Sequence, residues 1–166
     1  MKVVIQRTVL ISLLIILGAL FCIIIADPMF YPPGTFVHLD GRPSIMDHDW
    51  SPYGIGGWAY AAGDFLCHQE YSRSFILNGS QLPFCIRDIG LMIGFLVGLA
   101  LCIFKDASLK DVKYLKLGAF MLLPTLIQWC IEHFMSIDLP VSRFLLAVIL
   151  GIGASFIVGH ALYRIE

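Results

Sequence analysis

The chain has 166 residues, 58% of them hydrophobic, and a mean hydropathy of +0.84. A water-soluble domain of this length cannot bury so much apolar surface, so the composition excludes a soluble protein and predicts an integral membrane protein. The net charge of −1 gives no reason to expect a nucleic-acid partner, and the five cysteines are too few and too dispersed for a disulfide-rich scaffold.

Four segments are apolar enough to cross the hydrocarbon core of a bilayer, which takes about 20 residues in a helix. The first ends at Ala26-Asp27-Pro28 without a small-residue cleavage site, so we interpret it as a retained span and not as a signal peptide. The fold class that follows is an all-α membrane protein with one membrane domain over residues 1–166. Its spans are predicted at about 9–26, 86–104, 117–135 and 141–163.

The region between the first two spans, residues 27–85, is predicted to form an outer cap. Its first part, Asp27–Tyr53, is rich in proline and aspartate and should be irregular. The segment Tyr53–Leu66 is apolar but rich in glycine, and at about 1.5 Å per residue it is too short to cross. We therefore expect an interfacial or re-entrant helix there.

The distribution of lysine and arginine predicts the orientation, because cytoplasmic loops carry an excess of both. One side would hold every lysine and both termini, and the other would hold the cap and no lysine. We therefore expect cytoplasmic termini and a multi-pass protein of the cell membrane. The basic residues of the cytoplasmic side are Lys2, Arg7, Lys105, Lys110, Lys113, Lys116 and Arg164, and those of the outer side are Arg42, Arg73, Arg87 and Arg143.

Small residues recur every four positions in two of the spans. This spacing lets helix backbones approach closely. Such packing matters in lipid, where the hydrophobic effect does not drive helices together. We expect the second and fourth spans to touch along these ridges, within one chain or across a homodimer. The ridges are Gly90, Gly94 and Gly98 in the second span and Ala147, Gly151, Ser155 and Gly159 in the fourth.

Ionisable residues gather at the predicted outer ends of the spans. Glu132 and His133 end the third span, Arg143 opens the fourth and Arg87 opens the second. Charges at membrane level usually face protein or water and often mark a functional site, so Glu132 and His133 are candidate catalytic residues. The alternative is structural, with Glu132, Arg143 and Arg87 forming ion pairs that brace the helix ends.

The stretch Leu66–Gly90 contains a dense motif of reactive and turn-forming residues. It comprises Cys67-His68-Gln69, Arg73-Ser74-Phe75, and then Gly79, Gln81, Pro83, Cys85, Arg87 and Gly90. This pattern resembles the signature of the domain-of-unknown-function family 2085, a group of small predicted membrane proteins with Cys-His-Gln, Arg-Ser-Phe, Gly and Pro-x-Cys-x-Arg-Cys-x-Gly. Gln128, Glu132 and Arg143 resemble weaker features of the family. The resemblance implies a membrane protein and brings no known activity with it.

This chain departs from the family signature at Asp88, where the family has a second cysteine three residues after Cys85. Positions i and i+3 share a face at a helix start. A disulfide between Cys67 and Cys85 would tolerate the aspartate and could add about 3 kcal/mol to the cap. The protein would then be a disulfide-braced scaffold or an accessory subunit of a membrane complex, with a membrane-protein partner.

Two further interpretations of the same residues stay open. A metal site built from Cys67, His68, Cys85 and Asp88 would also tolerate the aspartate, since zinc accepts carboxylate as well as thiolate ligands. With Glu132 as general base, such a site could make a zinc-dependent enzyme that acts on a lipid-linked substrate. Thiol redox exchange by the two cysteines is the third interpretation, which the missing Cys-x-x-Cys motif disfavours.

The predicted orientation can be tested by labelling cysteine substitutions from outside intact cells. Asn78, within the glycosylation sequon Asn78-Gly79-Ser80, is expected outside, and Lys110 is expected in the cytoplasm. An impermeant thiol reagent should therefore modify Asn78→Cys and spare Lys110→Cys. The reverse pattern would overturn the assignment of every segment to its side.

Overall fold

The computed structural model describes residues 2–135 and 139–164. Within them, four helices are long and apolar enough to cross a membrane, at Val4–Phe30, Ile86–Lys105, Val112–Glu132 and Pro140–Arg164. This confirms the predicted fold class, while the side on which the termini lie stays a prediction. The helices are α1 (Lys2–Ala26), α2 (Trp58–Leu66), α3 (Ile86–Lys105), α4 (Val112–Met135) and α5 (Pro140–Arg164), and the strands are β1 (Ser74–Leu77) and β2 (Ser80–Cys85).

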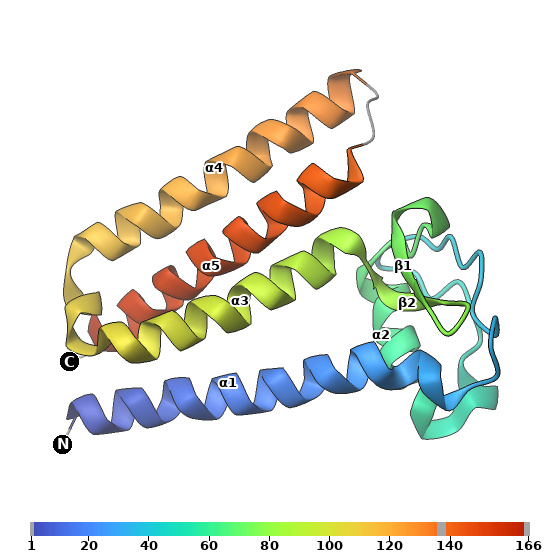
Figure 1. The fold of residues 1–166 in the computed structure, drawn as a ribbon, viewed down its shortest axis with the longest axis horizontal. Helices are drawn as coiled ribbons and strands as arrows, with labels where there is room; N and C mark the ends of the chain where they lie inside the picture. The colour runs from blue at the N-terminus through green and yellow to red at the C-terminus, as the bar shows by residue number, and fades with distance from the viewer. Residues whose placement is uncertain (1, 136–138, 165–166) are drawn as a thin grey trace. The chain divides into compact units, whose positions relative to one another are not determined.

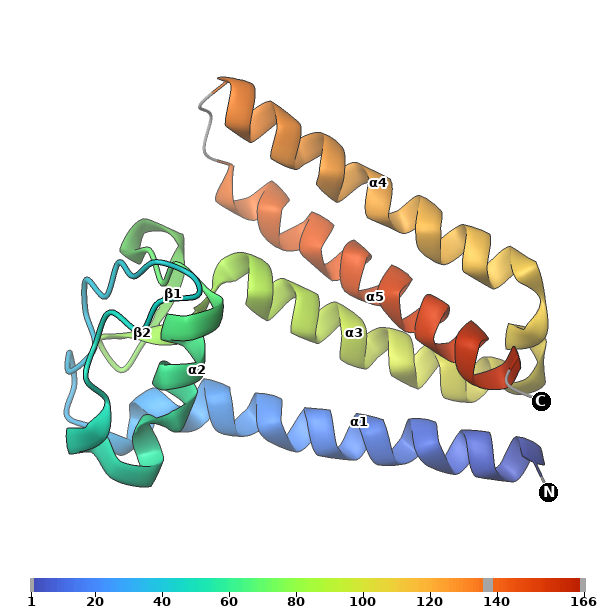
Figure 2. The ribbon, with the colours of Figure 1, turned by 180° about the vertical axis from the view of Figure 1, so that it is seen from behind.

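The chain divides into two compact units. We call residues 1–19 with 90–166 the helical unit and residues 20–89 the hairpin unit. In the helical unit, α5 lies between α3 and α4 in both views (Figures 1 and 2). Its apolar core consists of Leu10, Leu99, Cys102, Leu109, Phe156 and Tyr163.

Helices α3 and α5 approach each other through small residues. A Cβ atom added to Gly94 would collide with the backbone of Val148, and one added to Gly151 would lie 2.6 Å from the amide nitrogen of Phe95. Beside them, the Ser155 hydroxyl donates a hydrogen bond of 2.7 Å to the carbonyl of Phe95. Because these positions have no room for a side chain, the ridge sets the distance between the two backbones.

Helices α4 and α5 also meet at a pair of glycines, which the sequence analysis did not single out. A Cβ atom on Gly118 would lie 2.6 Å from the Gly153 carbonyl oxygen, and one on Gly153 would lie 2.8 Å from that of Gly118. Nearer the other end, the Thr125 hydroxyl donates to the carbonyl of Leu146 at 2.9 Å. The outer face of α4 is apolar and exposed at Phe120, Leu126 and Ile127, as expected of a surface that contacts lipid.

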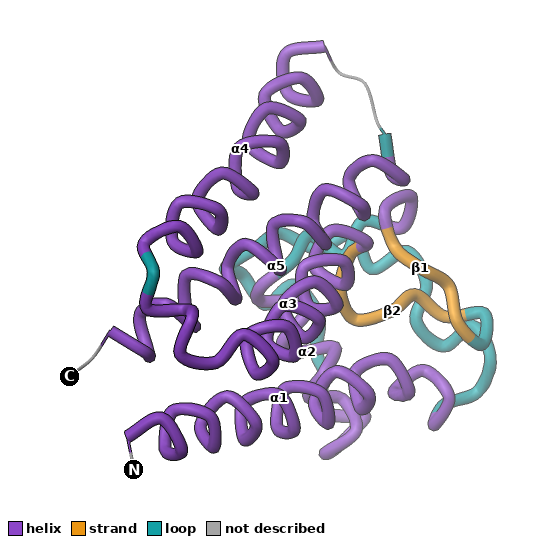
Figure 3. The backbone as a smooth tube through the Cα atoms, turned by 60° about the vertical axis from the view of Figure 1, so that its left-hand side comes forward, coloured by secondary structure: helices purple, strands orange, loops and turns teal. Residues whose placement is uncertain are grey.

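The hairpin unit contains α2 and the antiparallel strands β1 and β2 (Figure 3). A cluster of aromatic side chains forms its core. Phe36 stacks on Tyr60 with ring centroids 3.8 Å apart, and Trp50 packs beside them. The buried carboxylate of Asp64 accepts hydrogen bonds of 2.9 Å from the indole of Trp50 and the backbone of His48. These contacts give the region a packed core, and residues 31–50 form no helix or strand, as expected of an irregular segment.

The hairpin itself was not predicted, although its turn has a recognisable sequence. Asn78 and Gly79 both have positive φ angles, 51° and 70°, which an Asn-Gly turn accommodates with little strain. The Asn78 side-chain amide donates to the carbonyls of Pro28 and Tyr31, each at 3.0 Å. Attachment of a glycan to this nitrogen would replace one of its two hydrogens and so remove the donor of one of these bonds.

The close approach of α3 and α5 predicts a sharp difference between two identical substitutions. Gly94→Ala should lower the free energy of unfolding by about 1–3 kcal/mol, because its methyl group overlaps the backbone of Val148. Gly18→Ala in α1 is the control, since nothing lies within 4 Å of its Cβ position. Thermal unfolding in detergent would measure both, and equal melting temperatures would show that α3 and α5 do not pack through this ridge.

Candidate metal centre

Three chain segments of the hairpin unit bring Cys67, Cys85 and Asp88 together. Cys67 follows the last turn of α2, where its backbone amide donates to the carbonyl of Gly63 at 2.8 Å. Cys85 ends β2, and Asp88 lies in the first turn of α3. Since β2 runs directly into α3, the strand end and the helix start present Cys85 and Asp88 as one surface facing Cys67.

The possible ligand atoms of these residues, two sulfurs and a carboxylate oxygen, all lie within 4.8 Å of one another. The cysteines approach each other to 3.3 Å and are free thiols, not joined by a disulfide in this structure. The Cys85 sulfur lies 3.1 Å from Asp88 Oδ2, and the backbone amide of Cys85 donates to the Cys67 sulfur at 3.4 Å. Cys67 is buried, and the other two are half-buried.

The two thiols have different acidities because they interact with each other. A hydrogen bond from Cys67 to the sulfur of Cys85 lowers the pKa of Cys85, and the same bond together with burial raises the pKa of Cys67. Cys85 also directly precedes α3, and a helix N-terminus favours a thiolate. When Cys85 is protonated, its thiol can instead donate to the Asp88 carboxylate. A fully ionised cluster would hold three adjacent negative charges, which a bound cation would neutralise.

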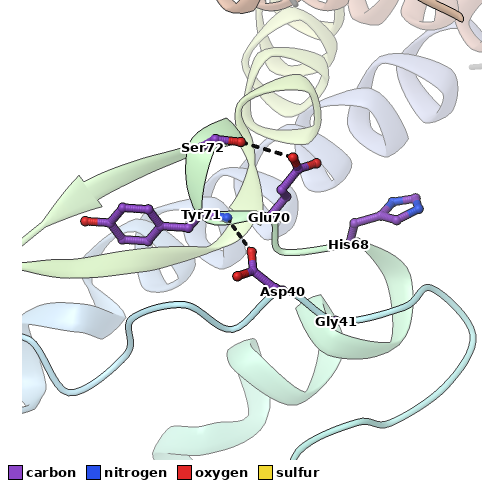
Figure 4. Close-up of a pocket in the computed structure, with 6 residues that line it drawn as sticks. All are labelled: Asp40, Gly41, His68, Glu70, Tyr71 and Ser72. Atoms are coloured by element: carbon purple, nitrogen blue, oxygen red, sulfur yellow. Dashed lines mark hydrogen bonds between the residues drawn. The ribbon is translucent and has the colours of Figure 1, made fainter. Parts of the chain in front are cut away.

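The structure does not bring His68 into this cluster, although the sequence analysis counted it among the possible ligands. His68 is exposed and lines a separate open hollow of about 480 Å³ with Asp40, Gly41, Glu70, Tyr71 and Ser72 (Figure 4). In that hollow the Asp40 carboxylate accepts a 2.8 Å hydrogen bond from the Tyr71 amide, and Ser72 donates to Glu70 at 3.1 Å. Adjacent residues of an extended chain point in opposite directions, which explains why Cys67 and His68 separate.

Two glutamines of the motif, to which the sequence analysis gave no role, position the cysteines. The Gln69 side chain, fully buried, donates to the carbonyl of Pro83 at 2.8 Å and to that of Tyr60 at 3.3 Å. Gln81 donates from its own side chain to the Gln69 carbonyl at 2.7 Å. Gln69 follows Cys67 by two residues and Pro83 precedes Cys85 by two, so these bonds hold the two cysteine-bearing segments side by side.

Of the other predicted charged residues, Glu132 and Arg143 lie in the helical unit and Arg87 lies in the hairpin unit. Arg143 donates to the Glu132 carboxylate at 2.8 Å, and both side chains are buried, 4% and 9% exposed. Gln128 completes the network by donating to Glu132 at 3.0 Å and to the hydroxyl of Ser142 at 2.8 Å. Arg87 lies in the first turn of α3. The side chain of His133 lies outside the described part of the structure.

Four apolar helices long enough to span a membrane and a cysteine-carboxylate cluster next to one of them define a small multi-pass membrane protein with a polar site. A family model described as predicted membrane protein (DUF2085) matches residues 67–159, which is more than half of the chain. The protein belongs to this family, and the match confirms the resemblance noted in the sequence. It covers the cluster and α3 to the C-terminal part of α5. No curated protein and no solved structure matches the chain.

Removal of the Gln69 side chain should separate the two cysteines. Gln69→Ala would leave the buried carbonyls of Pro83 and Tyr60 without these donors, at a cost of about 1–3 kcal/mol for each group left unsatisfied. We expect mild diamide treatment to join Cys67 and Cys85 readily in the native sequence and more slowly in the variant. Gln128→Ala, which alters the helical unit only, is the control, and equal rates in Gln69→Ala would show that the glutamine does not position the thiols.

Proposed function

We propose that the protein is a metal-binding membrane protein whose site consists of Cys67, Cys85 and Asp88, with zinc as the metal that best fits these ligands. The observation that carries the proposal is the convergence of two sulfurs and a carboxylate oxygen within 4.8 Å. Zinc is bound by thiolate at about 2.3 Å and by carboxylate at about 2.0–2.2 Å, so one ion can reach three such atoms with little movement.

The surroundings of the cluster support a bound cation. The backbone amide of Cys85 points at the Cys67 sulfur, a type of hydrogen bond that stabilises and orients a ligating thiolate. Burial of Cys67 excludes water from one side of the site. The replacement of the family's cysteine by Asp88 keeps an anionic ligand at this position, whereas a dithiol pair between Cys85 and residue 88 would be lost.

Among the described residues, the group contains three ligands, and zinc usually takes four. The fourth position would be filled by water or a small anion. Structural zinc sites are closed by four protein ligands, while three ligands with an open position are typical of zinc that binds or activates a further molecule. The open position therefore favours a zinc ion that binds or activates a further molecule over a zinc ion with a purely structural role.

A disulfide-braced scaffold or accessory subunit is the second candidate, and the 3.3 Å approach of the cysteines favours it. The two states exclude each other, since thiols joined in a disulfide no longer supply thiolate ligands. Both candidate functions place the protein in the cell membrane. A homodimer or a membrane-protein partner would cover part of the apolar surface of α4, which otherwise contacts lipid.

Metal analysis combined with a thiol count separates the two candidates. Protein purified with zinc present should hold about one zinc per chain with all thiols reactive once it is unfolded in chelator. Asp88→Ala should lose most of the zinc, and Asp88→Cys, which restores the family residue, should retain it. Cys130→Ser, which changes a cysteine outside the cluster, should leave the zinc content unchanged.

Two results would overturn the proposal. The first is protein without zinc and with two unreactive thiols at Cys67 and Cys85, which would establish the disulfide. The second is an equal zinc content in Asp88→Ala and the native sequence, because the carboxylate would then not be a ligand.

A further inference from the structure

The helical unit has a groove between α4 and α5. The residues that line it are distant in sequence from the cysteine cluster. Its volume is about 370 Å³, and it is lined by Leu115, Ile157, His160, Ala161 and Arg164. Three of these five side chains are purely apolar, while Arg164 is exposed in the last turn of α5. The groove therefore combines an apolar wall with a single cation at its helix end.

Basic residues surround this end of the helical unit. The start of α1 is tied there by a 3.1 Å hydrogen bond from Gln6 to the carbonyl of Leu162, and the turn after α3 by a 2.7 Å contact between His160 Nδ1 and the Leu109 carbonyl. The only described ion pair at this end joins Lys113 to Asp111. The exposed basic side chains are Arg7, Lys105, Lys110, Lys113, Lys116 and Arg164.

The groove is also lined by His160, one of whose ring nitrogens has no hydrogen-bond partner among the described residues. Its ring is 3% exposed, and because a carbonyl oxygen can only accept, Nδ1 must donate to Leu109. In the neutral ring Nε2 is then an acceptor, and it has no hydrogen-bond partner among the described residues. Because this nitrogen is enclosed by protein atoms in the structure, a hydroxyl group on a bound molecule would supply the missing donor only after neighbouring side chains move aside.

We propose that this groove binds an anionic phospholipid with a hydroxylated headgroup. The acyl chain would lie along Leu115, Ile157 and Ala161, the phosphate would pair with Arg164, and a headgroup hydroxyl would approach Nε2 of His160. Basic pockets between membrane helices are suited to anionic headgroups, and the bilayer presents lipid to every exposed groove of such a protein. The excess of basic side chains at this end favours an anionic lipid over a zwitterionic one.

Native mass spectrometry of the full chain tests the proposal by counting lipids retained after exchange into detergent. Incubation with phosphatidylglycerol should leave one lipid bound per chain, and incubation with phosphatidylcholine should leave fewer. Arg164→Gln should reduce retention of phosphatidylglycerol about fivefold, the effect expected from one basic residue at an anionic headgroup. Ala161→Trp, which fills the exposed wall of the groove, should reduce it as well.

The controls separate a specific groove from diffuse charge. Arg7→Gln removes a basic residue of α1 that does not line the groove and should reduce retention much less than Arg164→Gln does. An equal loss in Arg7→Gln and Arg164→Gln would overturn the proposal, as would unchanged retention in Ala161→Trp. Displacement of the lipid by millimolar inorganic phosphate would also contradict it, because the apolar wall would then contribute nothing. Unchanged melting temperatures of the variants in lipid-free detergent would show that they remain folded.

Phosphatidylmethanol, which is anionic but has no headgroup hydroxyl, tests the role of His160. The native protein should retain it less well than phosphatidylglycerol, and His160→Phe should abolish that difference. Equal retention of both lipids by the native protein would contradict the assignment of the hydroxyl to Nε2.

Discussion

One buried hydrogen bond joins the two segments on which the cysteine cluster depends. It runs from the fully buried Gln69 side chain to the carbonyl of Pro83 and is 2.8 Å long. One segment leaves α2 and the other is the end of β2, which enters α3, and β1, the turn and the start of β2 separate them in sequence. Gln81 reinforces the connection, because its side-chain nitrogen donates to the carbonyl of Gln69 and its side-chain oxygen accepts from the amide of Leu39. These buried amides hold Cys67 beside Cys85, together with the hydrogen bond from the Cys85 amide to the Cys67 sulfur.

The same region explains why reactive residues lie so close to a membrane helix. The strand β2 continues into α3 without a loop, so the helix N-terminus and the strand end form one rigid corner. Cys85 and Asp88 occupy this corner, where the helix dipole favours negative charge. The corner thus concentrates anionic groups at the start of a helix that crosses the membrane. A bound metal ion would relieve their mutual repulsion.

Sequence reasoning predicted the membrane fold because hydropathy and helix length depend on local composition, and four apolar helices are present. The contact through Gly94 and Gly151 could also be predicted from the sequence, since a four-residue repeat of small residues is a local pattern. The hairpin was missed despite its Asn78-Gly79 turn, because the short strands lack the alternation of a half-buried sheet: β2 is buried at nearly every position. The separation of His68 from Cys67 and the buried roles of Gln69 and Gln81 depend on tertiary contacts, which spacing along the chain does not contain.

The most direct test of the metal centre is X-ray absorption at the zinc edge, because it reports which atoms surround the ion. The proposed site predicts two sulfur neighbours at about 2.3 Å together with oxygen at about 2.0–2.2 Å. It also predicts a third sulfur in the Asp88→Cys protein, in place of one oxygen. A spectrum with oxygen and nitrogen neighbours alone would place the zinc elsewhere and contradict the assignment of Cys67, Cys85 and Asp88 as its ligands.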